Sequence, residues 1–151
     1  MRLGWGIITV QGSEFRVQGY GCIETASTLS VENRLLQIYT TLTEIIEKEK
    51  PEAMAVEELF FNTNVTTAMV VGQARGVVLL LGAQHKLPIG IYTPLQVKIA
   101  VTGFGRAEKA QVGQMVKVIL KLPAVPKPDD TADALAVAIT HAFSYKINKL
   151  K

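Results

Sequence analysis

Three carboxylates stand at positions where metal-dependent chemistry can take place. Glu57 ends the short apolar run 53–57, and Asp130 and Asp133 lie three residues apart at the start of an apolar stretch. A spacing of three places two side chains on one face of a helix. Strand ends and helix starts meet at the same edge of an α/β layer, where ligand sites form. Carboxylates gathered there repel each other, and Mg²⁺ or Mn²⁺ relieves the repulsion because both ions prefer oxygen ligands.

The chemistry that such a set predicts is phosphodiester hydrolysis. Two ions about 4 Å apart activate a water molecule and stabilise the leaving oxygen. A second interpretation needs no metal. Aspartate is favoured at a helix start by capping and by the helix dipole, and the pair Glu57-Glu58 is also typical of a solvated turn. Spacing alone leaves both interpretations open.

Basic and aromatic residues near these acids indicate a polyanion. Lys98, Arg106 and Lys109 surround a glycine-rich turn, and lysines at such turns contact phosphates. Phe60 and Phe61 follow the acidic pair after Leu59, and because adjacent side chains of an extended segment point opposite ways, one ring can face solvent. An exposed ring can stack on bases or wedge between them. The alternatives are ordinary surface lysines and two rings in the core.

The charge of the chain is uneven along its length. Residues 1–85 carry 6 Lys/Arg against 9 Asp/Glu, a net −3, and residues 86–151 carry 10 against 4, a net +6. A basic C-terminal half suits a polyanionic partner. Hydrophobic residues make up 48% of the 151 residues and charged residues 19%, which predicts a folded domain and excludes a disordered chain.

The expected location is the cytoplasm. Cys22 is the single cysteine, so a disulfide framework within the chain is excluded, as in a reducing compartment. The apolar stretch 68–83 is interrupted by Gln73 and Arg75, and we expect no membrane span there. The N-terminus lacks the pattern of a signal peptide.

The elements that must position these residues follow from periodicity and turn signals. A β-hairpin is followed by a helix that Ser30 is expected to cap, and then by strands that alternate with helices. This order predicts a mixed α/β sheet covered by helices. The predicted strands are 3–10, 14–23, 53–57 and 87–92, and the predicted helices are 30–50, 63–85, 94–101, 107–120 and 130–145.

Four segments, in this order along the chain, resemble the RuvC family of Holliday-junction resolvases. The similarity covers essentially residues 1–145 and leaves 146–151 as a basic C-terminal tail. The segments are AVEELFF at 55–61, GQARG at 72–76, QVK at 96–98 with the stretch 103–112, and DTADALAVAITH at 130–141.

The resemblance implies an RNase H-like fold and a homodimer that cuts four-way DNA junctions with two Mg²⁺ ions per subunit, which Mn²⁺ can replace. It also implies a branch-migration helicase complex as partner, no membrane, and a helix with the GQARG segment at the dimer interface. By position, it makes Glu57, Asp130 and Asp133 the catalytic, metal-binding carboxylates. The predicted DNA-binding residues are Phe60, Phe61, Lys98, Arg106 and Lys109.

The N-terminus departs from the family pattern. The family opens with a strand that reads roughly GIDPG, whose aspartate is the first catalytic carboxylate, and a glycine-aromatic-glycine run follows. Here that run is Gly4-Trp5-Gly6, so the aspartate would fall before Met1. We therefore expect the first, central strand to be absent, with unpaired neighbours, low stability and impaired cleavage. Either Met1 is an internal methionine taken as the start, or the chain is truncated.

Three functions follow from these observations. The leading hypothesis is a Mg²⁺-dependent junction endonuclease. The second is a junction-binding protein that does not cleave, because it keeps the basic residues and the interface helix without the first aspartate. The third is an RNase H-like nuclease that acts on RNA or on other DNA structures.

Overall fold

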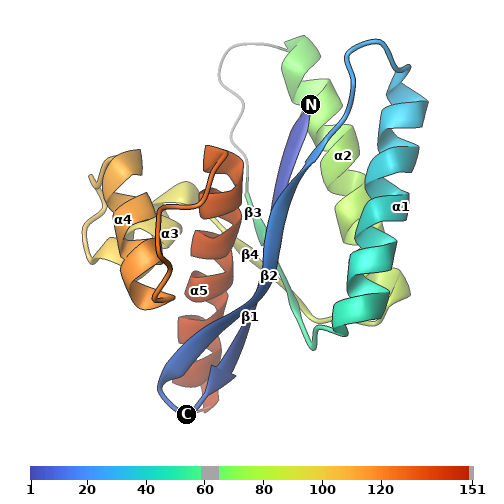
Figure 1. The fold of residues 1–151 in the computed structure, drawn as a ribbon. Coiled ribbons are helices and arrows are strands. Elements are labelled where there is room, and N and C mark those ends of the chain that lie inside the picture. Colours follow the sequence, from blue (N-terminus) through green and yellow to red (C-terminus); the bar gives the residue numbers. More distant parts are fainter. Residues whose placement is uncertain (59–64, 150–151) are drawn as a thin grey trace.

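The computed structural model of the chain describes residues 1–58 and 65–149. Its helices and strands follow the predicted order, with boundaries within two residues of the prediction except at the end of the last helix (Figure 1). They are β1 (Arg2–Gln11), β2 (Glu14–Glu24), α1 (Val31–Glu49), β3 (Met54–Glu57), α2 (Val65–Gln84), β4 (Ile89–Tyr92), α3 (Pro94–Thr102), α4 (Lys109–Ile119) and α5 (Asp129–Lys149).

The strands form two hydrogen-bonded pairs. β1 and β2 are antiparallel and joined by a tight turn at Gly12, whose φ of 62° is a conformation that glycine adopts without strain. β3 and β4 are parallel, with Glu57 opposite Tyr92 at their ends. Within the described residues the two pairs are separate sheets, so β1 has a partner on one edge only, and so does β3. Within the described residues, the predicted mixed sheet is thus present as one antiparallel and one parallel pair of strands.

Helices cover the strands from both sides. Figure 1 shows α3, α4 and α5 on one side of the strands and α1 and α2 on the other. Each side has its own apolar core. The first includes Val97, Val116, Leu135 and Ile139, and the second includes Ile38, Leu42, Ala74 and Leu81.

The run Gly4-Trp5-Gly6 on β1 lets α5 pack closely against this strand. A Cβ atom at Gly4 would overlap the backbone carbonyl of Asp130, and one at Gly6 would lie 2.5 Å from Leu135 Cδ2. Trp5 belongs instead to the core under α1 and α2. Alternation along a strand explains both facts, because successive side chains point to opposite faces. The glycines therefore set how near the start of α5 comes to β1.

Two local predictions need correction. Ser30 does precede α1, but its hydroxyl oxygen accepts a hydrogen bond from Asn33 Nδ2 (2.9 Å) and makes no side-chain cap bond. The Asn33 amide thus donates to the oxygen that would otherwise accept from a backbone N–H of the first helical turn. At the other end of the chain, α5 continues through Lys149, so residues 146–149 extend the helix backbone.

α2 is long and apolar enough to cross a membrane by length and composition alone. It packs along α1 instead, where Ala74 and Leu81 are buried. The sequence of α2 also contains Gln73 and Arg75, which interrupt its apolar residues. One side of α2 is therefore packed against the domain, whereas Val65, Met69 and Leu80 of the same helix are exposed.

Candidate active site

A pocket of about 530 Å³ opens where β3 ends and α5 begins. Figure 1 shows both ends at one edge of the molecule, the upper edge in this view, where β1 also starts. The charged residues that line the pocket are Glu57, Lys98, Arg106, Glu108, Lys109 and Asp133. Its apolar lining includes Val97, Ala107, Val112 and Ala136.

The charged groups come from β3, α3, α5 and the segment at the start of α4. Glu57 is the last residue of β3, and the backbone N–H of Glu58 donates to Tyr92 O (2.7 Å), which holds the strand end against β4. Asp133 lies in the second turn of α5, and Lys109 is the first residue of α4. Because these elements are far apart in the sequence, tertiary packing alone brings the groups together.

Two of the three acids that line the pocket, Glu57 and Asp133, have raised pKa values. Burial raises the pKa of Glu57, and the nearby charge of Asp133 raises it further. Burial also raises the pKa of Asp133, although a hydrogen bond and the positive charge of Lys109 act against this. Lys109 Nζ lies 3.2 Å from Asp133 Oδ2, and this hydrogen bond raises the pKa of Lys109. The pocket is therefore a place where additional positive charge is favoured.

Asp130 is placed differently from the other two predicted carboxylates. It is not among the residues that line the pocket, and its backbone carbonyl abuts Gly4 of β1. Its charge is near enough to raise the pKa of Asp133 and, after burial, that of the Cys22 thiol. Within residues 1–58 and 65–149, no three His, Cys, Asp or Glu side chains are grouped closely enough to hold a metal ion.

The donors that are present suit one hard cation. Mg²⁺ keeps several waters and is bound through one or two carboxylates together with substrate phosphates. Glu57 and Asp133 supply two carboxylates in a half-buried pocket, and both have raised pKa values that a bound cation would lower. The residues therefore fit one such ion. Glu108 is the third acid that lines the pocket, and no other acid of the described residues does so.

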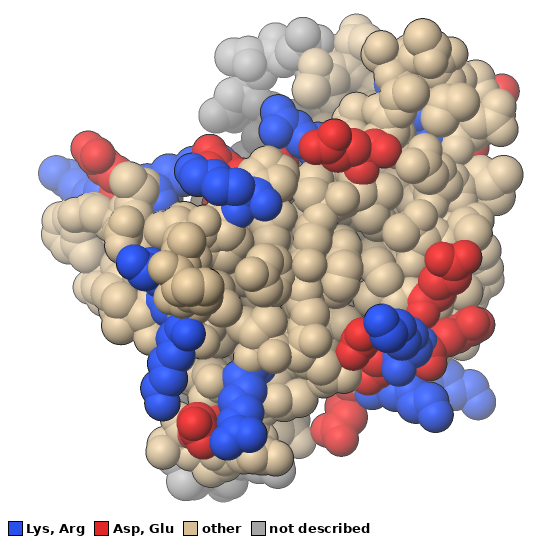
Figure 2. Space-filling view, viewed as in Figure 1, with Lys and Arg blue, Asp and Glu red and all other residues tan. Residues whose placement is uncertain are grey.

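The predicted basic residues Lys98, Arg106 and Lys109 all line the pocket. Figure 2 shows basic and acidic side chains next to one another along the upper part of this face. Phe60 and Phe61 lie outside the described residues.

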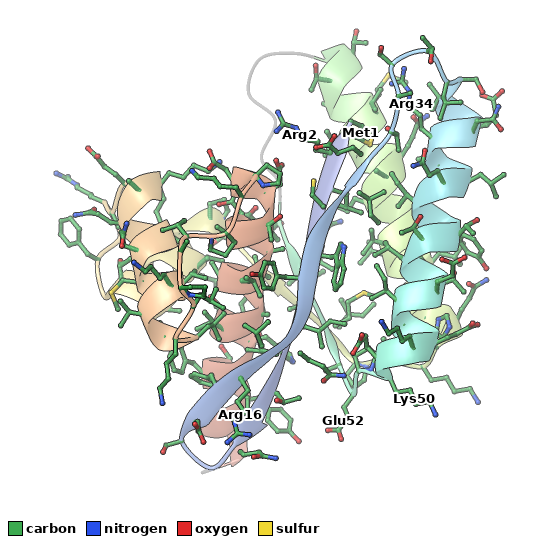
Figure 3. All side chains as sticks on the ribbon, viewed as in Figure 1. Met1, Arg2, Arg16, Arg34, Lys50 and Glu52 are labelled. Atoms are coloured by element: carbon green, nitrogen blue, oxygen red, sulfur yellow. The ribbon has the colours of Figure 1, made fainter. Side chains whose placement is uncertain are left out.

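Several residues at this edge were missed by the sequence analysis. Asp129 contacts two lysines, with Oδ1 3.2 Å from Lys127 Nζ and Oδ2 4.0 Å from Lys109 Nζ. Figure 3 shows Arg2 at the same upper edge, whereas Arg16, Lys50 and Glu52 lie at the opposite end. No sequence spacing connects Asp129 with Lys109, because their contact depends on how α4 packs against α5.

A second missed pair ties the sheet to α5. Tyr92 Oη and His141 Nδ1 are 2.8 Å apart, and burial lowers the pKa of His141. Tyr92 is the register partner of Glu57, so this hydrogen bond fixes the strand end that presents Glu57. The sequence shows both residues as isolated, since they lie 49 positions apart.

Comparison with known proteins gives a consistent family. A protein-family sequence model described as crossover junction endodeoxyribonuclease RuvC matches residues 1–141. The crossover junction endodeoxyribonuclease RuvC of Alkaliphilus metalliredigens is 57% identical over 142 residues, which span 94% of this chain and 87% of the relative. The protein of the same name from Halothermothrix orenii is 55% identical over 147 residues, which span 97% and 89%.

Two solved structures are similar over nearly the whole chain. The Thermus thermophilus RuvC structure matches with a TM-score of 0.90 and 37% identity, over 97% of this chain and 90% of that one. The T. thermophilus RuvC in complex with a Holliday junction substrate matches with a TM-score of 0.93 and 36% identity, over 98% and 90%.

Proposed function

The chain belongs to the RuvC family of crossover junction endodeoxyribonucleases, and from this premise we propose that it hydrolyses phosphodiester bonds in four-way DNA junctions. Its fold is the RNase H-like fold of that family. The observation that supports the proposal is the pocket in which Glu57 and Asp133 meet Lys98, Arg106 and Lys109. Acidic side chains that can bind a cation and basic side chains that can bind a phosphate thus lie together at one edge of the domain.

The roles of the residues follow from their contacts. Lys98 and Arg106 form no ion pair within the described residues, so their charges are available to the DNA backbone. Lys109 is held by Asp133 and neutralises part of the local acid charge until phosphate enters. Glu57 orients the attacking water, because its carboxylate ends a strand that is held in place by β4.

We propose Mg²⁺ as the cofactor, with Mn²⁺ as a substitute. Glu57 and Asp133 would hold it, and Asp130 stays a predicted ligand for a second ion. A bound cation lowers the pKa of water and stabilises charge on the leaving oxygen. Burial of Glu57 and Asp133 and the repulsion that each experiences from nearby acids support the assignment, because a cation relieves both effects.

The proposed assembly is a homodimer through α2. Val65, Met69 and Leu80 are 77%, 61% and 53% exposed, and nothing lies within 4 Å of a Cβ built at Gly72 or Gly76. These five positions recur at intervals of three and four, so they form one stripe along the helix. Small residues in such a stripe let a second helix approach closely.

The remaining expectations rest on the family. We propose residues 1–145 as the resolvase domain, which acts in the cytoplasm with a branch-migration helicase complex as partner. Phe60 and Phe61 stay predicted DNA contacts, together with the three basic residues of the pocket.

The test is cleavage of a labelled synthetic four-way junction, with linear duplex and RNA–DNA hybrid as competing substrates. Mg²⁺-dependent paired nicks in the junction support the proposal, and Glu57→Gln should remove them. Binding without nicking in Mg²⁺ or Mn²⁺ would instead indicate a junction-binding protein. Preferential cleavage of the hybrid would contradict the junction assignment.

A further inference from the structure

A second groove lies beside the candidate active site. Its volume is about 430 Å³, within the range of small-ligand sites. The lining includes Phe104, Ala107, Ala110, Gln111, Gln114 and Met115. Ala107 lines this groove and the carboxylate pocket alike, so the two are neighbours.

The turn that carries Phe104 is held on both sides. The backbone N–H of Phe104 donates to Thr102 Oγ1 (3.1 Å), and Thr102 Oγ1 lies 2.6 Å from Lys98 O. The backbone N–H of Ala107 donates to Phe104 O (3.1 Å). Gly103, with a φ of 77°, permits the reversal after α3. Phe104 is 58% exposed on this fixed turn, so the fold presents an aromatic side chain to solvent at little cost in ordering.

The surroundings of Phe104 favour a nucleotide over an apolar partner. Arg106 follows two residues later and lines the pocket together with Lys98, and neither cation is engaged in an ion pair within the described residues. Gln111 Oε1 accepts from Glu108 N (2.8 Å), which leaves its amide Nε2 as a donor. The side chain of Gln114 makes no hydrogen bond within the described residues. An aromatic side chain, the amide donor of Gln111, the amide of Gln114 and adjacent cations match a base, its edge and its phosphate.

We propose that this groove holds one unpaired nucleotide of the DNA strand that enters the carboxylate pocket, with its base stacked on Phe104. The inference rests on the proposed function and adds a contact that selects branched or unstacked DNA over continuous duplex. A base can stack on Phe104 only where its own stacking and pairing in the duplex are interrupted, as at a branch point. Gln111 and Gln114 then contact the base edge, and Arg106 contacts the adjoining phosphate.

The experiment measures affinity for a fluorescent four-way junction with Ca²⁺ in place of Mg²⁺, over a series of salt concentrations. Phe104→Ala should weaken binding by about 5- to 150-fold, the range of lost base–aromatic stacking. Phe104→Trp should restore wild-type affinity, and Phe104→Leu should not. Leu36→Ala is the matched control, because Leu36 is 60% exposed on α1.

The salt dependence separates stacking from charge. Phe104→Ala should leave the slope of log affinity against log salt unchanged, whereas Arg106→Ala should reduce its magnitude by about one. Thermal melts should show equal stability for all variants, since the altered side chains are exposed.

The possible failures are distinguishable. If the wild type does not bind the junction, the proposed function fails and the groove assignment fails with it. If the wild type binds and Phe104→Ala binds equally well, the groove assignment alone is overturned, and a protein partner becomes the better occupant. Wild-type affinity in Phe104→Leu would overturn stacking as the mode of contact.

Discussion

Glu57 and Asp133 are carboxyl groups whose pKa values are raised by burial. The charge of Asp133 also raises the pKa of Glu57, and the charges of Asp130 and Asp129 raise the pKa of Asp133. A raised pKa means that the folded chain binds protons that the unfolded chain has released. The contribution to stability is therefore present at low pH and is lost as the pH rises from the unfolded pKa values, about 4, through the higher folded values. At neutral pH, ionisation of these two groups lowers the free energy of unfolding of the cation-free protein. Such a loss of stability is typical of residues that serve function.

Glu57→Gln should remove the loss of stability that the ionised Glu57 carboxylate causes at neutral pH. We expect the variant to be more stable than the wild type at pH 7 without divalent cation, by about 0.5–2 kcal/mol, and to gain less stability on acidification. Urea unfolding between pH 4 and 8 measures both effects. Glu52→Gln is the control, because Glu52 is exposed at the opposite end of the molecule. Lower stability of Glu57→Gln at pH 7 would contradict the predicted repulsion.

Between elements, the contact of β1 with α5 depends on glycine. The carbonyl of Asp130 occupies the space that a Cβ at Gly4 would need, so the position of the first turn of α5 depends on β1. Because Asp130 and Asp133 both lie in this part of α5, the glycine-aromatic-glycine run also positions the candidate site. The run thus has a packing role that its sequence pattern alone does not explain.

Gly4→Ala should destabilise the protein by about 1–3 kcal/mol, because the added methyl group overlaps backbone rather than a movable side chain. Gly19→Ala on β2 is the matched control. A Cβ at Gly19 would lie 3.4 Å from Trp5 Cζ3, which is an ordinary contact, so we expect little destabilisation there. Chemical denaturation at one protein concentration compares the two. Equal stabilities would show that α5 shifts at no cost.

The division between β1 and β3 leads to a second prediction at this scale. An added N-terminal segment with the family's GIDPG-type strand should pair with the free edges of β1 and β3 and raise the melting temperature by several degrees. It should also increase junction cleavage. The same segment with its aspartate changed to asparagine should keep the stabilisation and lose the gain in cleavage. An extension that leaves the melting temperature unchanged would argue against an added strand between the two pairs.

Across the whole molecule, α2 presents its exposed stripe on the side away from the core beneath α1. A Met69→Asp substitution places a charge in the middle of that stripe and should convert a dimer into a monomer, because an uncompensated charge at an apolar interface is costly. Light scattering coupled to size exclusion measures the mass. Leu36→Asp on α1, a position of similar exposure, should leave the mass unchanged. A monomeric wild type would contradict the proposed homodimer.

The sequence by itself determined the order, type and approximate ends of the elements. Periodicity, glycine turns and proline stops act over a few residues, and so hairpin, helices and strands could be predicted. The resemblance to the RuvC family also implied that Glu57, Lys98, Arg106 and Lys109 belong to one site, and all four line one pocket. The sequence placed Ser30 correctly before α1, but it did not show that the hydroxyl would bind the Asn33 amide and make no cap bond.

Only the tertiary structure decided which groups face one another. Asp130 and Asp133 share a helix turn, yet only Asp133 lines the pocket, because the close approach of β1 and α5 decides where each residue of the turn lies. The contacts of Asp129 with Lys109 and of Tyr92 with His141 join elements that no local pattern connects. Local propensities act along the chain, whereas the positions of side chains from separate elements depend on how those elements pack.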